Sequence, residues 1–334
     1  MTKLRWPLDV RGDVLVGKNG ELYLAGGNHS ILKYAEGAKL PALNLSNLAA
    51  NIAYRKEISA KHGARFAHII APEKYMVFRD SFPIEAPGSM AQQFFEAGHT
   101  GAIYPVQLLS DPGIGRTYAK TDTHWTPAAL AAISRLIASV AEIGAATANE
   151  VDQRIRAAIK TTDEIFYGDL GRKLTPQVGE ARPVLSVSAD VERFENGVAH
   201  DFASPVNDGR LILIESRSAA TEKTLLIFGD SYLFHALDYL PFYFKRIVFL
   251  RTRFLHEEIV SMVRPAVVIS QMAERYLTRV DLDTRAPPFF FVPHLLGRTP
   301  QMTAQAAKAF ALAFSSGREI DVSVFDKMVP KANG

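Results

Sequence analysis

Residues 224–270 read TLLIFGDSYLFHALDYLPFYFKRIVFLRTRFLHEEIVSMVRPAVVIS. Three apolar segments in this stretch have the length and residue types of buried strands, and two helical patterns separate them. The five elements lie at 224–228, 232–240, 246–250, 254–263 and 266–270. Strands that alternate with helices form a parallel sheet, and strands that are apolar throughout are typical of a sheet with helices on both faces. The stretch therefore predicts an α/β sheet.

The same alternation occurs earlier in the chain. Residues 46–62 predict an amphipathic helix with Ser46 as its cap, and FAHII at 66–70 follows as a buried strand. Residues 101–106 predict another short strand. An Ala-rich helix is expected at 127–143, with a proline in its first turn. The α/β pattern thus extends over most of the chain.

Two further regions complete the predicted organisation. Alternating apolar residues around Asn19-Gly20 in the segment 13–24 predict a β-hairpin, because this dipeptide favours the tight turn. Residues 163–222 contain short apolar segments among Gly, Pro, Asn and Asp, which predicts a β-rich insertion. Residues 303–315 predict a packing helix. We expect one domain over residues 1–334 with the insertion inside it.

The composition excludes several classes of protein. The 334 residues are 48% hydrophobic and 22% charged, which is typical of a globular domain and unlike disordered or fibrous chains. There is no cysteine, so disulfides, zinc–thiolate sites and cysteine nucleophiles are excluded. The net charge of +3 comes without a long basic run, so no nucleic-acid partner is expected.

No segment of the sequence has the composition of a signal peptide, and none reaches the about 18 apolar residues of a membrane span. The chain as written is therefore expected in the cytoplasm. If an N-terminal export or anchor segment precedes it, the expected location is the periplasm. The sequence does not predict an oligomeric state.

Ser231 in Gly229-Asp230-Ser231 is the predicted nucleophile. It follows an apolar strand and precedes a helix, and catalytic groups of open α/β sheets lie at the carboxyl ends of strands. Backbone N–H groups at the start of the helix can stabilise an oxyanion. The alternative is that Asp230 or Ser231 only caps the helix.

Asp122 and His124 are the predicted partners of that serine. A serine is a weak nucleophile until a base takes its proton, and the base must be held by an acceptor. With one residue between them, both side chains point to one side of an extended segment. The alternatives are a capping Asp122 and a packed His124. His235, one helical turn after Ser231, is a second possible base, although a packing role is the simpler interpretation.

Six short elements occur in the order of a known family pattern and together span residues 17–277. They are Gly17-Lys18-Asn19-Gly20-Glu21-Leu22-Tyr23-Leu24, Pro72-Glu73-Lys74, Asp122-Thr123-His124-Trp125, Gly168-Asp169-Leu170, Gly229-Asp230-Ser231 and Gln271-Met272-Ala273-Glu274-Arg275-Tyr276-Leu277. In these motifs the chain resembles the SGNH hydrolase-like polysaccharide O-acetyltransferases of the alginate O-acetyltransferase type. Each element is short, so their common order carries the resemblance.

The resemblance implies a three-layer, flavodoxin-like SGNH fold and a triad of Asp122, His124 and Ser231, with the Asp-His pair upstream of the serine. It implies an acetylated donor and a glycan acceptor, with a membrane O-acyltransferase as a possible source of acetyl groups. No cofactor and no metal are expected. Family members usually carry a signal sequence or membrane anchor and act in the periplasm, and this chain as written shows neither.

Four other residues are possible oxyanion or substrate contacts. The backbone N–H of Tyr232 follows the nucleophile and is a possible oxyanion donor. Arg275 and Lys74 match motif positions, and a guanidinium can bind the carboxylate of an anionic sugar through two parallel hydrogen bonds. Trp125 can stack on a sugar ring. For each of these residues a structural role is the alternative.

The sequence favours an O-acetyltransferase that acts on a bacterial exopolysaccharide or cell-surface glycan through an acetyl-serine. Two alternatives remain: a carbohydrate acetylesterase with the same triad, and a non-catalytic protein that binds or assembles a polysaccharide. The triad alone does not distinguish transfer from hydrolysis, because His124 can activate either a sugar hydroxyl or water.

Overall fold

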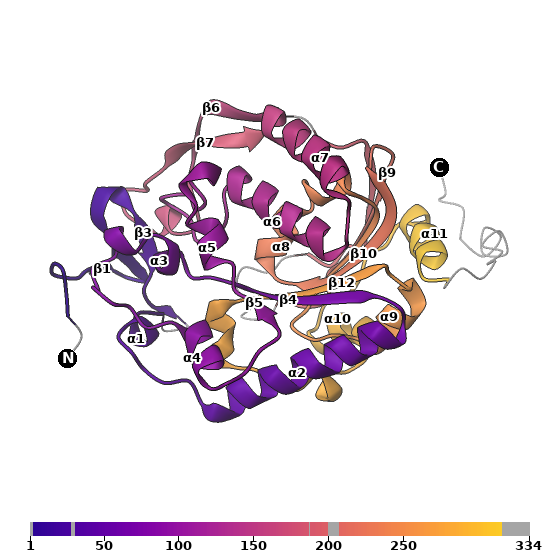
Figure 1. The fold of residues 1–334 in the computed structure, drawn as a ribbon, viewed down its shortest axis with the longest axis horizontal. Coiled ribbons are helices and arrows are strands. Elements are labelled where there is room, and N and C mark those ends of the chain that lie inside the picture. The colour runs from indigo at the N-terminus through magenta and orange to yellow at the C-terminus, as the bar shows by residue number, and fades with distance from the viewer. Residues whose placement is uncertain (1–2, 28–30, 187, 200–206, 316–334) are drawn as a thin grey trace.

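A seven-stranded sheet forms the centre of the molecule (Figure 1). The structure is a computed structural model that describes residues 3–27, 31–186, 188–199 and 207–315. In spatial order the strands are β5 (Ala102–Ile103), β4 (Arg65–Ala71), β12 (Val267–Ala273), β10 (Thr221–Gly229), β11 (Phe244–Arg251), β9 (Leu211–Ser216) and β8 (Val191–Glu195). The first five are parallel, and β9 and β8 pair antiparallel. The predicted α/β class is confirmed.

Helices cover both faces of this sheet, as its apolar strands predicted (Figure 1). On one face lie α6 (Pro127–Val140), α7 (Ala145–Ala158) and α8 (Ser231–Ala236). On the other lie α2 (Ala42–Lys61), α9 (Glu257–Val263) and α11 (Ala304–Ala313). Within β10, Leu225 and Ile227 face the first layer while Leu226 and Phe228 face the second. Burial of alternate residues on both sides explains why this strand is apolar throughout.

Smaller elements surround the central layers. The N-terminal sheet consists of β1 (Asp9–Arg11), β2 (Val14–Val16) and β3 (Leu22–Leu24). Asn19 and Gly20, between β2 and β3, have φ values of 59° and 76°, so the predicted hairpin is confirmed. The remaining helices are α1 (Ile31–Ala35), α3 (Lys74–Val77), α4 (Met90–Glu96), α5 (Val106–Leu109) and α10 (Val292–Leu295).

The predicted insertion at 163–222 is rich in strands but is not one separate sheet. β6 (Ile159–Phe166) and β7 (Glu180–Leu185) form a two-stranded sheet of their own. β8 and β9 instead extend the central sheet beyond β11. Of the two, β9 is largely buried, whereas the residues of β8 are exposed or partly buried. Both strands lie at the edge of the mostly parallel sheet, where antiparallel pairing is common.

Several predicted element boundaries were wrong. The helices predicted at 127–143 and 254–263 are observed at Pro127–Val140 and Glu257–Val263. Helix α2 begins at Ala42, and the Ser46 hydroxyl donates to the Leu43 carbonyl instead of capping the helix. The strand predicted at 101–106 is limited to β5, since α5 starts directly after Pro105. The helix after Ser231 ends at Ala236, ahead of a short 3-10 turn that contains Pro241, a residue that cannot extend an α-helix.

In the described parts of the chain, no helix combines the length and the apolar character needed to span a bilayer.

Candidate active site

Ser231 and Arg275 of the predicted site lie close together because they follow neighbouring parallel strands. Glu73 lies just after β4, Ser231 after β10 and Arg275 after β12, and these strands are adjacent in the order β4-β12-β10. The carboxyl ends of parallel strands meet at one edge of a sheet. A cavity of about 470 Å³ lies there, and its lining includes Ser231, His124 and Arg275.

The Gly229-Asp230-Ser231 turn is fixed by the Asp230 side chain. Asp230 Oδ1 accepts the backbone N–H of Tyr232 at 2.9 Å, which is the N-cap bond of α8. Asp230 Oδ2 accepts the backbone N–H of Ala273 at 2.7 Å and so joins the turn to the end of β12. The capping role considered from the sequence therefore belongs to Asp230. Ser231 is left as the first helical residue, half-buried beside the cavity.

Ser231, His124 and Asp122 form a continuous chain of hydrogen-bonding side chains. His124 Nε2 lies 2.9 Å from Ser231 Oγ, and His124 Nδ1 lies 2.7 Å from Asp122 Oδ1. The backbone N–H of His124 donates to the same Asp122 oxygen at 2.7 Å. The two side chains thus share one side of the segment, as their spacing predicted. This geometry can move the serine proton to the imidazole while Asp122 holds the ring.

The electrostatics of the pair favour its charged form. Burial acts to raise the pKa of Asp122, but the hydrogen bonds and charge of His124 outweigh it and hold the pKa below the usual range. Burial acts to lower the pKa of His124, but the hydrogen bond and charge of Asp122, followed by the charge of Asp169, leave that pKa raised. The site therefore stabilises an imidazolium at His124.

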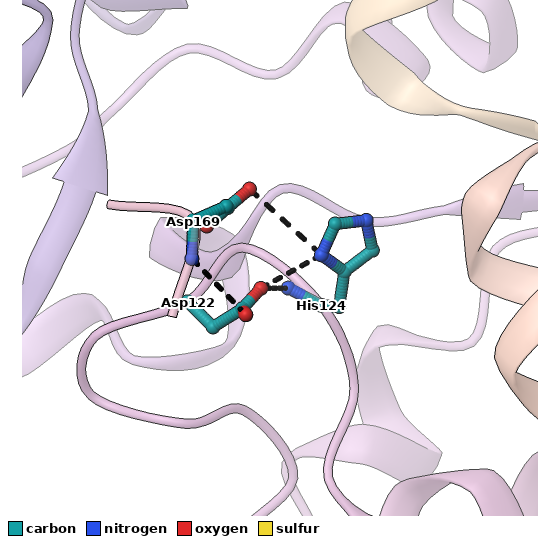
Figure 2. Close-up of side chains that lie close together, drawn as sticks. All are labelled: Asp122, His124 and Asp169. Atoms are coloured by element: carbon teal, nitrogen blue, oxygen red, sulfur yellow. Dashed lines mark hydrogen bonds and ion pairs between the residues drawn. The ribbon is translucent and has the colours of Figure 1, made fainter. Parts of the chain in front are cut away.

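Asp169 is a second carboxylate beside the imidazole (Figure 2). Asp169 Oδ2 lies 3.8 Å from His124 Nδ1, and the Asp169 backbone N–H donates to Asp122 Oδ2 at 3.2 Å. Desolvation and then the charge of Asp122 raise the pKa of Asp169, while the charge of His124 opposes them. The sequence marked this residue only through its Gly-Asp-Leu motif.

Among the described residues, Asp122, His124 and Asp169 are close enough together to hold a metal ion. Each offers one ligand atom, and these atoms lie within 4.8 Å of one another. A metal ion there would have to replace the proton between His124 Nδ1 and Asp122 Oδ1. The observed hydrogen bonds and a bound metal are thus alternatives, and the sequence-based expectation of no metal stays a prediction.

Tyr232 is placed differently from its predicted role. Its backbone N–H, predicted as an oxyanion donor, is taken up by Asp230 because the second residue of a helix is the usual target of an N-cap side chain. Its buried phenol donates to the carbonyl of Thr123 at 2.7 Å and accepts from Arg275 Nη2 at 3.0 Å. The side chain therefore joins the His124 segment to the end of β12.

Lys74 and Trp125 are buried and do not line the cavity, so neither can contact substrate as predicted. Lys74 Nζ donates to the carbonyls of Leu22, Ala119 and Lys120 at 2.6–3.0 Å and pairs with Glu21 at 3.0 Å. These contacts join the N-terminal hairpin to the segment before Asp122. Burial, as the largest effect, lowers the pKa of Lys74 to about 8.

Trp125 Nε1 donates to the Tyr118 hydroxyl at 2.9 Å, and the indole packs edge-on against Tyr232. A buried tryptophan needs such a partner for its N–H, which explains the pairing with Tyr118. The ring therefore supports the triad segment from inside the core and has no free face for a sugar.

Arg275 lines the cavity, but its positive charge is already balanced by the carboxylate of Glu73. Its Nε donates to Glu73 Oε1 at 2.7 Å, and the charge of Glu73 raises the pKa of the guanidinium despite burial.

His235 lies close to the site, with its ring centroid 5.0 Å from that of His124. Desolvation, and then the charge of His124, lower the pKa of His235 to about 4. The imidazole in contact with Ser231 Oγ is that of His124, and not that of His235.

The wall of the cavity also includes residues that sequence reasoning missed. Asp13 and Gly26 come from the N-terminal hairpin region, and Lys173 follows the Gly-Asp-Leu motif. Lys173 Nζ pairs with Asp13 Oδ2 at 3.2 Å. No local pattern marks these residues, since only the packing of the hairpin against the main domain brings them to the site.

No protein-family model and no curated protein matches the sequence. Solved structures do match. A DHHW family protein from Eubacterium siraeum is similar over 83% of this chain and 96% of its own, with 14% identity and a TM-score of 0.54. Bacillus cereus PatB1, solved with a sulfonyl adduct, is similar over 81% and 97%, with 12% identity and a TM-score of 0.56.

The O-acetyltransferase domain of Pseudomonas putida AlgJ also matches, over 86% of this chain and all of its own, with 17% identity and a TM-score of 0.48. At these identities the similarity is one of fold. The predicted three-layer α/β fold is thus confirmed, and it is shared with the DHHW family protein and with PatB1.

Proposed function

We propose that the chain is a serine-dependent O-acetyltransferase that acetylates hydroxyl groups of a bacterial exopolysaccharide or cell-surface glycan. The observation that carries the proposal is the pair of contacts from one imidazole, 2.9 Å from His124 Nε2 to Ser231 Oγ and 2.7 Å from His124 Nδ1 to Asp122 Oδ1. Such a chain activates a serine for attack on an ester carbonyl.

In the first half-reaction His124 Nε2 takes the proton of Ser231 Oγ as the oxygen bonds to the acetyl carbon of the donor. The tetrahedral oxyanion is stabilised by backbone donors, and the N–H of Ser231 itself is the first candidate because N–H groups at a helix start have no partner in the helix. His124 then returns the proton to the leaving oxygen. The donor departs as an alcohol, and acetyl-Ser231 remains.

In the second half-reaction His124 Nε2 takes the proton of an acceptor hydroxyl. The acceptor oxygen bonds to the acetyl carbon, the bond to Ser231 Oγ breaks, and the proton returns to Ser231. Asp122 stays ionised throughout and stabilises the imidazolium. No cofactor enters either step.

Three observations support this choice among serine-dependent reactions. The motif order, with Asp122 and His124 upstream of Ser231, resembles the acetyltransferases. The fold is that of PatB1, whose structure carries a sulfonyl adduct, and sulfonyl reagents typically modify activated serines. The AlgJ domain, described as an O-acetyltransferase, is a further match. A glycan acceptor outside the cytoplasm would require the periplasmic location, with a membrane O-acyltransferase as the source of acetyl groups.

The test is the partition of acetyl groups between sugar and water. The protein is incubated with p-nitrophenyl acetate and a rising concentration of uronate, hexose or amino-sugar oligomers. Acetyl-sugar and free acetate are then quantified, with Ser231→Ala as the matched control. We expect acetyl-sugar to rise at the expense of acetate with at least one acceptor, because an oriented hydroxyl can outcompete the molar excess of water.

If acetate accounts for all turnover with every acceptor, the protein is the esterase. If neither product forms above the Ser231→Ala control, it is the binding or assembly protein.

A further inference from the structure

We propose that Asp169 is a positioning residue of the triad: it fixes the Asp122-Thr123-His124 segment and places a second carboxylate beside the imidazole of His124. This inference rests on the proposed function, because it assigns how that same site is held and tuned. The triad pattern itself accounts for one carboxylate only. The structure has two.

The loop that carries Asp169 is built onto the triad segment. The backbone N–H groups of Leu170 and Gly171 donate to the carbonyl of Thr121 at 3.1 and 2.9 Å. At Gly168 the backbones are so close that a Cβ atom would lie 2.2 Å from the same carbonyl oxygen. Residues 168–171 therefore dock on the residue that precedes Asp122.

Asp169 itself holds the middle of the segment. Its Oδ1 accepts the backbone N–H of Thr123 at 2.8 Å, and its Oδ2 accepts the Thr123 hydroxyl at 2.5 Å. Its own backbone N–H donates to Asp122 Oδ2, the oxygen that does not face His124. Asp122 is thus held from both sides. Rotation of either Asp122 or the Thr123 peptide would break these bonds and move the imidazole.

The charge of Asp169 acts on the same ring. Its carboxylate lies 3.8 Å from His124 Nδ1, within ion-pair distance, although Nδ1 points to Asp122. Asp169 therefore stabilises the imidazolium without competing for its proton. The other groups that face His124 are Ser231, Tyr232 and His235 on α8 and Arg275 after β12. Of these, the Arg275 guanidinium carries a charge that opposes the imidazolium.

The test compares Asp169→Asn with Asp152→Asn. Asp152 is a matched control, because its Oδ1 also accepts a side-chain hydroxyl, that of Tyr243 at 2.5 Å, but it lies on α7 and does not line the cavity. Turnover of p-nitrophenyl acetate is measured against pH, and the titration of His124 is followed by NMR. For Asp169→Asn we expect kcat to fall about 10- to 100-fold with little change in KM, as a misplaced catalytic group costs about that much.

The expected pH effect has a definite sign. Loss of a negative charge beside the imidazole lowers the pKa of His124, so the acid limb of kcat/KM and the NMR titration both move to lower pH. Asp152→Asn is expected to leave both in place. Asp169→Glu keeps the charge but misplaces the Thr123 contacts, so it should lose kcat while its acid limb moves less than that of Asp169→Asn.

Two results would overturn the inference. One is an Asp169→Asn protein with the kcat and His124 titration of Asp152→Asn. The other is lower kcat together with lower thermal stability and an unmoved titration, which indicates a structural role only. The NMR titration does not depend on ester turnover. Turnover that survives in Ser231→Ala would therefore contradict the proposed function without deciding the role of Asp169.

Discussion

Asp122, His124 and Ser231 depend on one another in the proposed reaction, so loss of any one should disable the site. We expect Ser231→Ala, His124→Ala and Asp122→Ala each to lower ester turnover about 10⁴- to 10⁶-fold, with double variants little worse than single ones. Turnover of p-nitrophenyl acetate by protein with wild-type circular dichroism is the measurement.

His235→Ala is the control for that series. The His235 ring lies 5.0 Å from that of His124, but the contact to Ser231 Oγ is made by His124. The variant should therefore keep most of its turnover. A Ser231→Ala protein with near wild-type activity, or a His235→Ala protein as inactive as His124→Ala, would contradict the assignment.

The pH dependence of turnover follows from the raised pKa of His124. The base must be neutral, and Asp122 and Asp169 outweigh burial to lift its pKa above the ordinary value of 6.5. Activity should therefore fall as the pH drops through a midpoint above 6.5, measured as kcat/KM between about pH 5 and 9. Because its lowered pKa of about 4 leaves His235 neutral across that range, His235→Gln should not move the midpoint. A midpoint below 6.5, or one that follows the His235 variant, would refute this.

At the scale of elements, the loop at 168–171 depends on the absence of a side chain at Gly168. A Cβ atom there would lie 2.2 Å from the Thr121 carbonyl oxygen, a backbone atom with no freedom to move aside. We expect Gly168→Ala to lower the free energy of unfolding by about 1–3 kcal/mol, as overpacking does, and to reduce turnover by shifting Asp169.

Chemical denaturation and ester turnover test this expectation, with Gly144→Ala as the control. Gly144 precedes α7, has open space around its Cβ position and has a φ of −54°, which alanine adopts freely. Equal stability of the two alanine variants would show that the loop tolerates the added methyl group.

Local sequence predicted the elements better than it predicted what they contact. Apolar strands such as β10 and β12 were evident, because burial on both faces leaves few polar residues in them. Lys74 and Trp125 were misassigned, because a motif position does not reveal whether a side chain points to a cavity or into the core. The chemistry and spacing of Asp122 and His124 suggested that both belong with Ser231, and the order of six motifs strengthened that prediction; the structure brings the three side chains into contact.

For the whole molecule, the order of strands in space differs from their order in the chain. β12 lies between β4 and β10, and its pairing brings Val267 opposite both Arg65 and Leu225. No local periodicity encodes this arrangement, since it depends on how the layers pack. The hydrogen bonds between Glu73 and Arg275 and between Asp230 and Ala273 both depend on the place of β12 between β4 and β10.

The central place of β12 has a consequence for synthesis on the ribosome. Strands β4, β10 and β11 emerge first, but β4 and β10 have no shared neighbour until residues 267–273 leave the exit tunnel. Until then Asp230 lacks the Ala273 N–H that it accepts in the finished protein, so the Gly229-Asp230-Ser231 turn is not yet joined to β12. A nascent chain without β12 is therefore expected to have an unassembled site, and the reactivity of Ser231 toward esters should begin only after residues 267–273 have emerged.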